Sequence, residues 1–267
     1  MKREILIIVL SFVAMMGVHS AKAWGGTPHN VIAYAAQRHL TPQAKEKCDY
    51  YLKHTLAYYA TWMDYWRSIP EYKSVNNPHS IQAMPDGVHL DWGGTPKGRA
   101  MGHLKNALEE LSDGKYKNLP DSVVRQRLIN MVHYIPDMHC PGHVRFPKES
   151  FPEYNFKVRS KGKVIGTHGF WDGSLLRGRK WNCKDFADNV DKDISPKQIK
   201  KWQSGTLDDW ACDIIKNAHR RFELLPADTE LSDLTSEEIE KVHQLADEMA
   251  LKAVYRLAYV INTIFAE

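Results

Sequence analysis

The spacing of apolar and polar residues predicts helices along most of the chain. Apolar residues recur three and four positions apart, the period of one helical face. Start signals support the boundaries: in Thr27-Pro28 and Thr41-Pro42 a threonine can cap the helix and a proline can take its first position. The predicted helices cover residues 29–39, 42–52, 56–66, 98–111, 120–137, 196–202, 206–222 and 236–265, the last as one long helix or two in sequence.

One pair of strands interrupts this pattern. Residues 155–159 and 163–165 alternate in polarity on either side of Ser160-Lys161-Gly162, which predicts a β-hairpin. Residues 72–97 and 166–194 have little periodicity and are predicted as long loops, which in a helical protein usually serve a site. The sequence therefore predicts a single, mainly α domain with many helices, long loops and one small hairpin.

The first 23 residues have the pattern of a secretory signal peptide. Lys2 and Arg3 precede an apolar run over residues 5–18, and Ala21-Lys22-Ala23 fits the small-x-small cleavage rule. The run is too short to span a bilayer comfortably, and no later segment has the pattern of a membrane anchor. We therefore expect an exported protein, periplasmic or extracellular, whose mature domain comprises residues 24–267 and begins with the free α-amine of Trp24.

Composition and net charge exclude few classes of protein. Hydrophobic residues make up 43% and charged residues 25% of the chain, as in an ordinary globular protein. Cleavage would remove three of the 36 basic and one of the 32 acidic residues, so the net charge falls from +4 to +2. That charge is too small to indicate nucleic-acid binding by itself.

All four cysteines lie in the mature part: Cys48, Cys140, Cys183 and Cys212. In an exported protein they predict one or two disulfide bonds, and three complete pairings are open. Cys140, between His139 and Pro141, is alternatively a soft ligand for a metal ion.

The central stretch from His133 to His143 carries the strongest chemical signal. His133 and Asp137 are four residues apart, so on a helix they project from one face. Pro141-Gly142 should end that helix just before His143. Imidazole and carboxylate on one face suit a zinc-type cation. The alternative is a set of surface or hydrogen-bonded core residues.

Three further positions extend this signal. His168 and Asp172 repeat the spacing of His133 and Asp137, although for this pair alone a capping or surface role is the better explanation. Asp64 lies in an aromatic-rich helical segment and needs a partner if buried, either Arg67 or a cation. His89 is a lone histidine in a predicted loop, with simple exposure as the alternative.

Taken with Trp24 and His29, these residues form an ordered series. The series resembles the trinuclear-zinc, single-strand-specific nucleases and 3′-nucleotidases, secreted enzymes related to bacterial zinc phospholipase C. The motifs are Trp-x4-His, Trp-x-Asp-x-x-Arg, a loop histidine, His-x3-Asp-x5-His and His-x3-Asp. The resemblance reaches the last predicted helix, where residues 255–262 look like the family's ending.

The resemblance implies the zinc phospholipase C/nuclease-like fold and three zinc ions per chain. The first ion would be held by Asp64, His89, His133 and Asp137. The second would be held by the α-amine and carbonyl of Trp24, by His29 and by the shared Asp137. The third would be held by His143, His168 and Asp172.

The implied activity is hydrolysis of single-stranded DNA or RNA to 5′-phosphate products, together with 3′-nucleotidase activity. Asp64 and Asp137 would act through the metal ions, and Arg67 would stabilise charge on the reacting phosphate. No obligate protein partner is implied. Family members usually carry an aromatic residue directly after the loop histidine. Here Trp92 is the expected base-stacking residue and Asp91 the expected base contact, both at an unusual distance from His89.

Two other functions compete with this one. A zinc phospholipase C would have a longer spacing between Trp24 and His29 and a glutamate in place of Asp172, so both features favour the nuclease. A secreted, non-enzymatic protein that binds carbohydrate or peptide through its eight tryptophans would leave the histidine–aspartate series unexplained. It would also purify without stoichiometric zinc.

Overall fold

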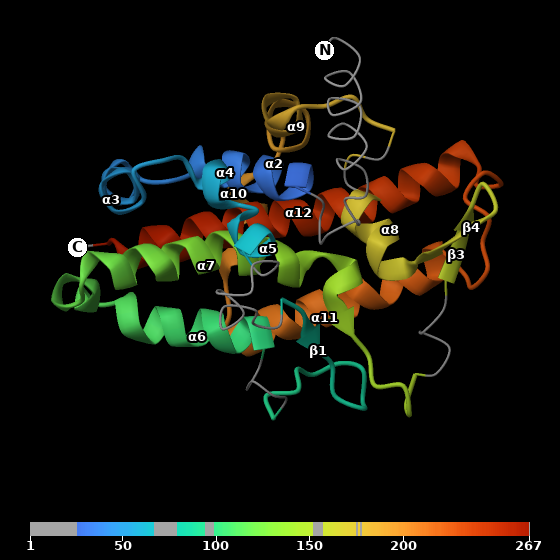
Figure 1. Ribbon diagram of the computed structural model, residues 1–267, viewed down its shortest axis with the longest axis horizontal. Coiled ribbons are helices and arrows are strands. Elements are labelled where there is room, and N and C mark those ends of the chain that lie inside the picture. The colour runs from blue at the N-terminus through green and yellow to red at the C-terminus, as the bar shows by residue number, and fades with distance from the viewer. Residues whose placement is uncertain are drawn as a thin grey trace, which may run out of the picture.

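Two long helices form the centre of the fold. The computed structural model describes residues 26–66, 79–93, 99–151, 157–174, 176 and 178–266. Helix α7 (Asp121–His139) packs against α12 (Ser236–Ile264), and both run along the long axis of the molecule (Figure 1). α12 begins with a capping box, in which Thr235 and Glu238 each accept from the other's backbone N–H. This cap defines the start of α12. The many buried side chains of α12 hold the helix in place.

The other helices cover this pair on two sides. α6 (Arg99–Leu111) lies on α7 and α11 (Leu207–Leu224) on α12, while α2 (Gly26–Gln37) contacts both central helices from the opposite side (Figure 1). The remaining helices are α3 (Pro42–Leu52), α4 (Leu56–Tyr59), α5 (Trp62–Trp66), α8 (Thr167–Ser174), α9 (Cys183–Val190) and α10 (Pro196–Gln203). Two 3₁₀ turns are η2 (Lys115–Asn118) and η3 (Pro141–His143).

Two small sheets complete the described part of the fold. β3 (Lys157–Ser160) pairs antiparallel with β4 (Lys163–Gly166). The turn residues Lys161 and Gly162 have φ of 49° and 74°, the left-handed geometry that suits a two-residue hairpin. β1 (Ile81–Gln82) pairs in parallel with β2 (Val144–Arg145). This second pair joins two segments that are far apart in the sequence.

The mainly α fold with one hairpin is confirmed, with three differences in detail. The segment predicted as one helix over 56–66 is divided into α4 and α5. The predicted loop over 166–194 instead contains α8 and α9, which are short, and α9 is stabilised by a capping box of Asn182 and Asp185. Within the stretch 72–97, residues 81–82 form β1. Short elements carry too few turns for periodicity to reveal them.

The described residues begin after the N-terminal segment and include all four cysteines. The predicted signal peptide, residues 1–23, lies outside the described residues. Among the helices of the described part, none has the length and apolar content needed to cross a bilayer. All four cysteines are free, so the expected disulfide bonds are not formed; the thiols belong to four separate elements, α3, the α7–η3 junction, α9 and α11.

Candidate metal centre

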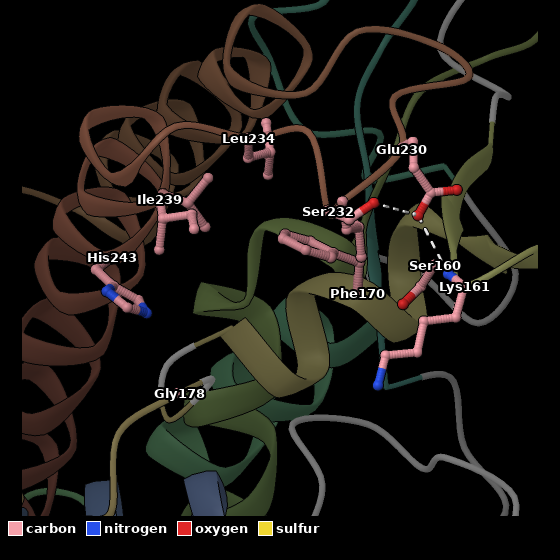
Figure 2. Close-up of a pocket in the computed structure, with 11 residues that line it drawn as sticks. Ser160, Lys161, Phe170, Gly178, Glu230, Ser232, Leu234, Ile239 and His243 are labelled. Atoms are coloured by element: carbon pink, nitrogen blue, oxygen red, sulfur yellow. Dashed lines mark hydrogen bonds between the residues drawn. The ribbon is translucent and has the colours of Figure 1, made fainter.

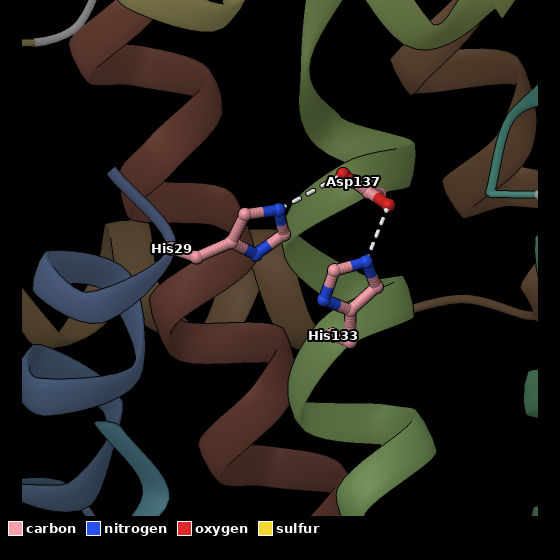
Figure 3. A group of neighbouring side chains, drawn as sticks. All are labelled: His29, His133 and Asp137. Atoms are coloured by element: carbon pink, nitrogen blue, oxygen red, sulfur yellow. Dashed lines mark hydrogen bonds and ion pairs between the residues drawn. The ribbon is translucent and has the colours of Figure 1, made fainter. Parts of the chain in front are cut away.

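A buried cluster of imidazoles surrounds the carboxylate of Asp137 near the end of α7. Asp137 is fully buried, and its two oxygens face different histidines: Oδ1 lies 3.0 Å from His29 Nε2 and Oδ2 lies 3.1 Å from His133 Nε2 (Figure 3). His29 comes from α2, and its ring stacks on that of His133 with centroids 4.4 Å apart. His133 and Asp137 project from one helical face, as their spacing predicts.

A fourth side chain, His79, joins this cluster from the segment before β1. Its Nδ1 lies 2.9 Å from His133 Nε2, 3.1 Å from Asp137 Oδ2 and 3.8 Å from Asp64 Oδ1. The Nδ1–H of His133 donates to the carbonyl of Ala60 at 2.7 Å. This bond leaves the Nε2 lone pair of the neutral ring directed at the cluster, the arrangement of a metal-binding histidine.

The second half of the cluster is built by η3 and α8. His143 Nε2 lies 3.0 Å from His168 Nε2 and 3.3 Å from Asp172 Oδ1. His168 and Asp172 are one turn apart on α8, and His168 Nε2 lies 3.5 Å from Asp172 Oδ2. On its other side, His143 Nδ1 lies 3.6 Å from Asp137 Oδ1, so the two halves are contiguous. The side chain of His168 is 55% exposed, which opens this half to solvent.

Gly142 allows α8 to approach η3 closely. A Cβ at this position would lie 3.0 Å from the carbonyl oxygen of His168 and 3.1 Å from its Cα. Gly142→Ala should therefore push α8 away, at a cost of about 1–3 kcal/mol for overpacking. We expect a lower melting temperature and about 10-fold weaker metal retention, measured by thermal denaturation and metal analysis. Gly166→Ala is the control, since its Cβ would meet nothing within 4 Å; equal behaviour of the two variants would contradict the prediction.

The charges in the cluster depend on one another. Burial alone would raise the pKa of Asp137, but His143, His133 and His29 outweigh it and hold that pKa well below its usual range. Burial lowers the pKa of His29 and of His79. For His143, burial is outweighed by Asp137 and Asp172, which raise its pKa to about 9. The cluster therefore holds an ionised Asp137 among imidazoles whose pKa values are shifted in opposite directions, down for His29 and His79 and up for His143.

Divalent cations fit this arrangement. A buried, ionised carboxylate needs a positive partner, and imidazoles supply one only when protonated. Within the described part of the chain, His29 Nδ1 and His79 Nε2 are buried without a hydrogen-bond partner. Three groups of described residues bring ligand atoms close enough to hold an ion: His29–His133–Asp137, Asp64–His79–His133 and Cys140–His143–Asp172. Nitrogen and carboxylate donors in such sets suit transition-metal ions.

Metal binding should release protons. In protein stripped of metal, Asp137 and Asp172 raise the pKa of His143 from the usual 6.5 to about 9, so a cation that binds below pH 9 should displace its proton. Affinity should then rise by up to about tenfold per pH unit toward pH 9. Calorimetric titration at neutral pH in buffers of different ionisation enthalpy measures the release, and buffer-independent heats would contradict it. Conversely, protonation stabilises the stripped fold fully below pH 6.5, and that stability is lost as the pH rises through about 9.

The structure places His79, and not His89, in the cluster. The side chain of His89 is 67% exposed and its Nδ1 lies 2.8 Å from Asp86 Oδ2, so the structure does not bring this expected metal ligand into the cluster. The sequence carries a local signal for only one of the two. Asp86-Gly87 precedes His89 and indicates an exposed turn. His79 lies two residues before β1, a strand of two residues that is too short for its pattern to be read from the sequence.

The residues expected to bind substrate lie elsewhere. Trp92 lines a cavity of about 790 Å³ between α6 and the start of α11, and its indole N–H donates to Asp208 at 2.5 Å. Asp91 accepts from the backbone N–H of Gly93. The cavity shares no lining residue with the metal cluster. The base-binding role expected of Asp91 and Trp92 stays a prediction, and the structure does not place these residues beside the cluster. The residue that follows His79 is Ser80, so an aromatic is missing there too.

Seven of the nine predicted ligands meet in the cluster: His29, Asp64, His133, Asp137, His143, His168 and Asp172. Trp24 and the predicted catalytic residue Arg67 lie outside the described residues. Arg145, two residues after His143 in the chain, supplies a cation nearby. Its Nε donates to Ser80 Oγ at 2.9 Å, and its charge is one of the influences that lower the pKa of His168, after burial and His143.

The last turn of α7 is anchored from behind the cluster. His139 is buried, its Nδ1–H donates to the carbonyl of Ile135, and its Nε2 accepts from Arg256 at 2.9 Å. Burial, followed by Arg256, lowers the pKa of His139 to about 3, so the ring is neutral. Arg256 is in turn bound by Asp213. This network makes His139 a supporting residue that orients α7.

A second cavity lies on the far side of α8. It measures about 310 Å³, and its lining combines apolar side chains, among them Phe170, Leu234 and Ile239, with polar ones such as Glu230 and His243 (Figure 2). Phe170 is two residues from both His168 and Asp172, so helical geometry places it on the opposite face of α8. The cavity is therefore separated from the metal cluster by the width of that helix.

Comparison with known proteins agrees with this geometry. The family model described as S1/P1 Nuclease matches residues 24–266. No curated protein matches the chain. The matched range contains every residue of the cluster. The chain therefore belongs to the S1/P1 nuclease family, whose members are metal-dependent hydrolases of phosphodiester bonds.

Proposed function

We propose that the protein is an exported, zinc-dependent nuclease that cleaves single-stranded DNA and RNA to 5′-phosphate products and also hydrolyses 3′-nucleotides. The observation that carries this proposal is the buried carboxylate of Asp137, which lies within 3.6 Å of nitrogens from four histidines. No hydrophobic or hydrogen-bonding role requires so many imidazoles around one acid. A pair of cations that share this carboxylate would be held close together.

The proposed ligand sets follow the cluster. One zinc ion takes Asp64, His79, His133 and Asp137. A second takes His29 and the shared Asp137, completed by the α-amine and carbonyl of Trp24. The third takes His143, His168 and Asp172. The family match begins at residue 24, which supports removal of residues 1–23 and a catalytic domain of residues 24–267.

The roles of the protein's own groups follow from these positions. When bound, zinc supplies Lewis acidity, which lowers the pKa of an attacking water and stabilises charge on phosphoryl and leaving oxygens. The carboxylates of Asp137 and Asp64 would supply the negative charge that holds the cations on the buried side of the cluster. His168, partly exposed, marks the side from which a phosphate reaches the cluster. Arg145, and Arg67 beyond the described residues, are the proposed cations for the reacting phosphate.

A single-stranded substrate suits this layout. A phosphodiester must reach a cluster whose acids and most of whose histidines are buried, which a stacked and paired backbone does less easily than a flexible one. The phospholipase C alternative gains no support from the second cavity, since that cavity faces away from the metal ligands across α8.

The proposal is tested with protein that begins at Trp24 and is loaded with zinc. It is assayed on end-labelled single-stranded and duplex oligonucleotides of one sequence, on a 3′-nucleotide and on phosphatidylcholine vesicles. We expect single strands to be cleaved at least about 10-fold faster than duplex, since unstacking and unpairing cost a few kcal/mol. Products should carry 5′-phosphates. Faster hydrolysis of phosphatidylcholine, or no cleavage of any nucleic acid, would overturn the proposal.

A further inference from the structure

Cys140 occupies a fixed position at the edge of the third ligand set. It joins α7 to η3, and its backbone N–H donates to the carbonyls of Asp137 and Pro136 while its carbonyl accepts from the N–H of His143. The side chain is fully buried and points to α8, where its thiol donates to Asp172 Oδ1 at 3.5 Å. The backbone therefore holds this sulfur in place beside a carboxylate and an imidazole.

Two of the distances among these donors match those around one tetrahedral ion. With zinc–sulfur bonds of about 2.3 Å and zinc–nitrogen or zinc–oxygen bonds of about 2.0–2.2 Å, tetrahedral ligand atoms lie roughly 3.3–3.6 Å apart. Cys140 Sγ is 3.5 Å from Asp172 Oδ1, and His143 Nε2 is 3.3 Å from that same oxygen. The three donor atoms all lie within 4.8 Å of one another.

We propose that Cys140 is a thiolate ligand of the metal ion held by His143, His168 and Asp172, which gives this site a sulfur donor. The inference rests on the proposed function, since it assumes the zinc centre. On binding, the thiol loses its proton to solvent and a sulfur–zinc bond forms, as coordination of a thiol to zinc requires. No oxidant or other reactant is needed.

A sulfur ligand has consequences for this ion. Thiolate is a soft donor that zinc binds strongly, so the third ion should be retained more firmly than a site of two imidazoles and one carboxylate would allow. The rival role for Cys140 is that of a thiol that only orients Asp172 by a hydrogen bond. The two roles differ in one observable, a direct bond between zinc and sulfur.

X-ray absorption at the zinc edge, combined with metal analysis, decides between them. The full mature protein loaded with zinc should show a sulfur scattering shell at about 2.3 Å beside the nitrogen and oxygen shell. Cys140→Ala should lose the sulfur shell and release its most firmly held zinc to a chelator at least about 10-fold more readily. Cys140→Ser keeps the size and the hydrogen bond of the side chain and should also lack the shell.

The other three cysteines provide the matched control. A variant with Cys48, Cys183 and Cys212 all replaced by alanine should keep the sulfur shell, because none of them belongs to the ligand groups among the described residues. Bound zinc with only nitrogen and oxygen neighbours would overturn the role of Cys140 and leave the nuclease proposal intact. A chain that binds no zinc would overturn both. A sulfur shell that survives in Cys140→Ser would assign the sulfur to another cysteine.

Discussion

Asp137→Asn should reduce phosphodiesterase activity by at least about 10³-fold, since metal ions contribute several kcal/mol to such reactions and each 1.4 kcal/mol is a factor of ten. The carboxylate lies within 3.1 Å of His29, His79 and His133, and an amide at its place keeps the shape but removes the charge. With no anion to hold two cations together, the purified variant should also contain fewer metal ions, measured by elemental analysis.

Asp191→Asn is the matched control for this substitution. Asp191 is likewise buried and bound to a histidine, with its Oδ2 2.7 Å from His39 Nε2 and its Oδ1 accepting from Tyr255. It belongs to none of the metal groups in the described part of the chain. We expect Asp191→Asn to lower thermal stability and to keep the metal content. Full activity and full metal content in Asp137→Asn would refute the bridging role.

His79→Ala should lower activity by at least about 100-fold, because it removes a proposed metal ligand, and even loss of the partners behind metal ligands costs about 10–100-fold. The ring of His79 is buried between Asp64, His133 and Asp137. The rate should be measured together with zinc content, since loss of a ligand predicts that both fall.

His89→Ala provides the comparison, since His89 lies ten residues after His79 in the same segment. Its side chain is exposed and bonded only to the turn at Asp86 among the contacts that the described residues make. Surface changes of this kind are usually within about 0.5 kcal/mol, which is about twofold in rate or affinity. If His89→Ala lost metal and activity while His79→Ala kept them, the cluster as described would be wrong.

The two histidines also show which parts of the site the sequence can predict and which it cannot. The pairs His133–Asp137 and His168–Asp172 could be predicted because a spacing of four fixes a shared helical face, whatever the rest of the chain does. In the structure, His133 and Asp137 share one face of α7, and His168 and Asp172 share one face of α8. The helices with several turns and the hairpin could be predicted for the same reason, since their patterns are local.

The position of a loop histidine depends on contacts that are distant in the sequence. His79 reaches the cluster because the next residues pair with Val144 and Arg145, and no local pattern near His79 announces that pairing. Likewise, the approach of α8 to η3 depends on the missing side chain at Gly142. Order along the chain was therefore sufficient to recognise the family but not to choose between two histidines ten residues apart.

The two-residue pairing of β1 with β2 has a consequence for how this site varies in evolution. Ile81 and Gln82 are in register with Val144 and Arg145. This pairing, which follows His79 in the chain, holds the main chain so that His79 lies beside His143. Because this pairing anchors the C-terminal flank of His79, we expect the number of residues between Asp64 and His79 to vary among relatives. Relatives should differ in that interval more than in the spacing from His79 to the strand, and a search with a fixed gap after Asp64 would miss some of them.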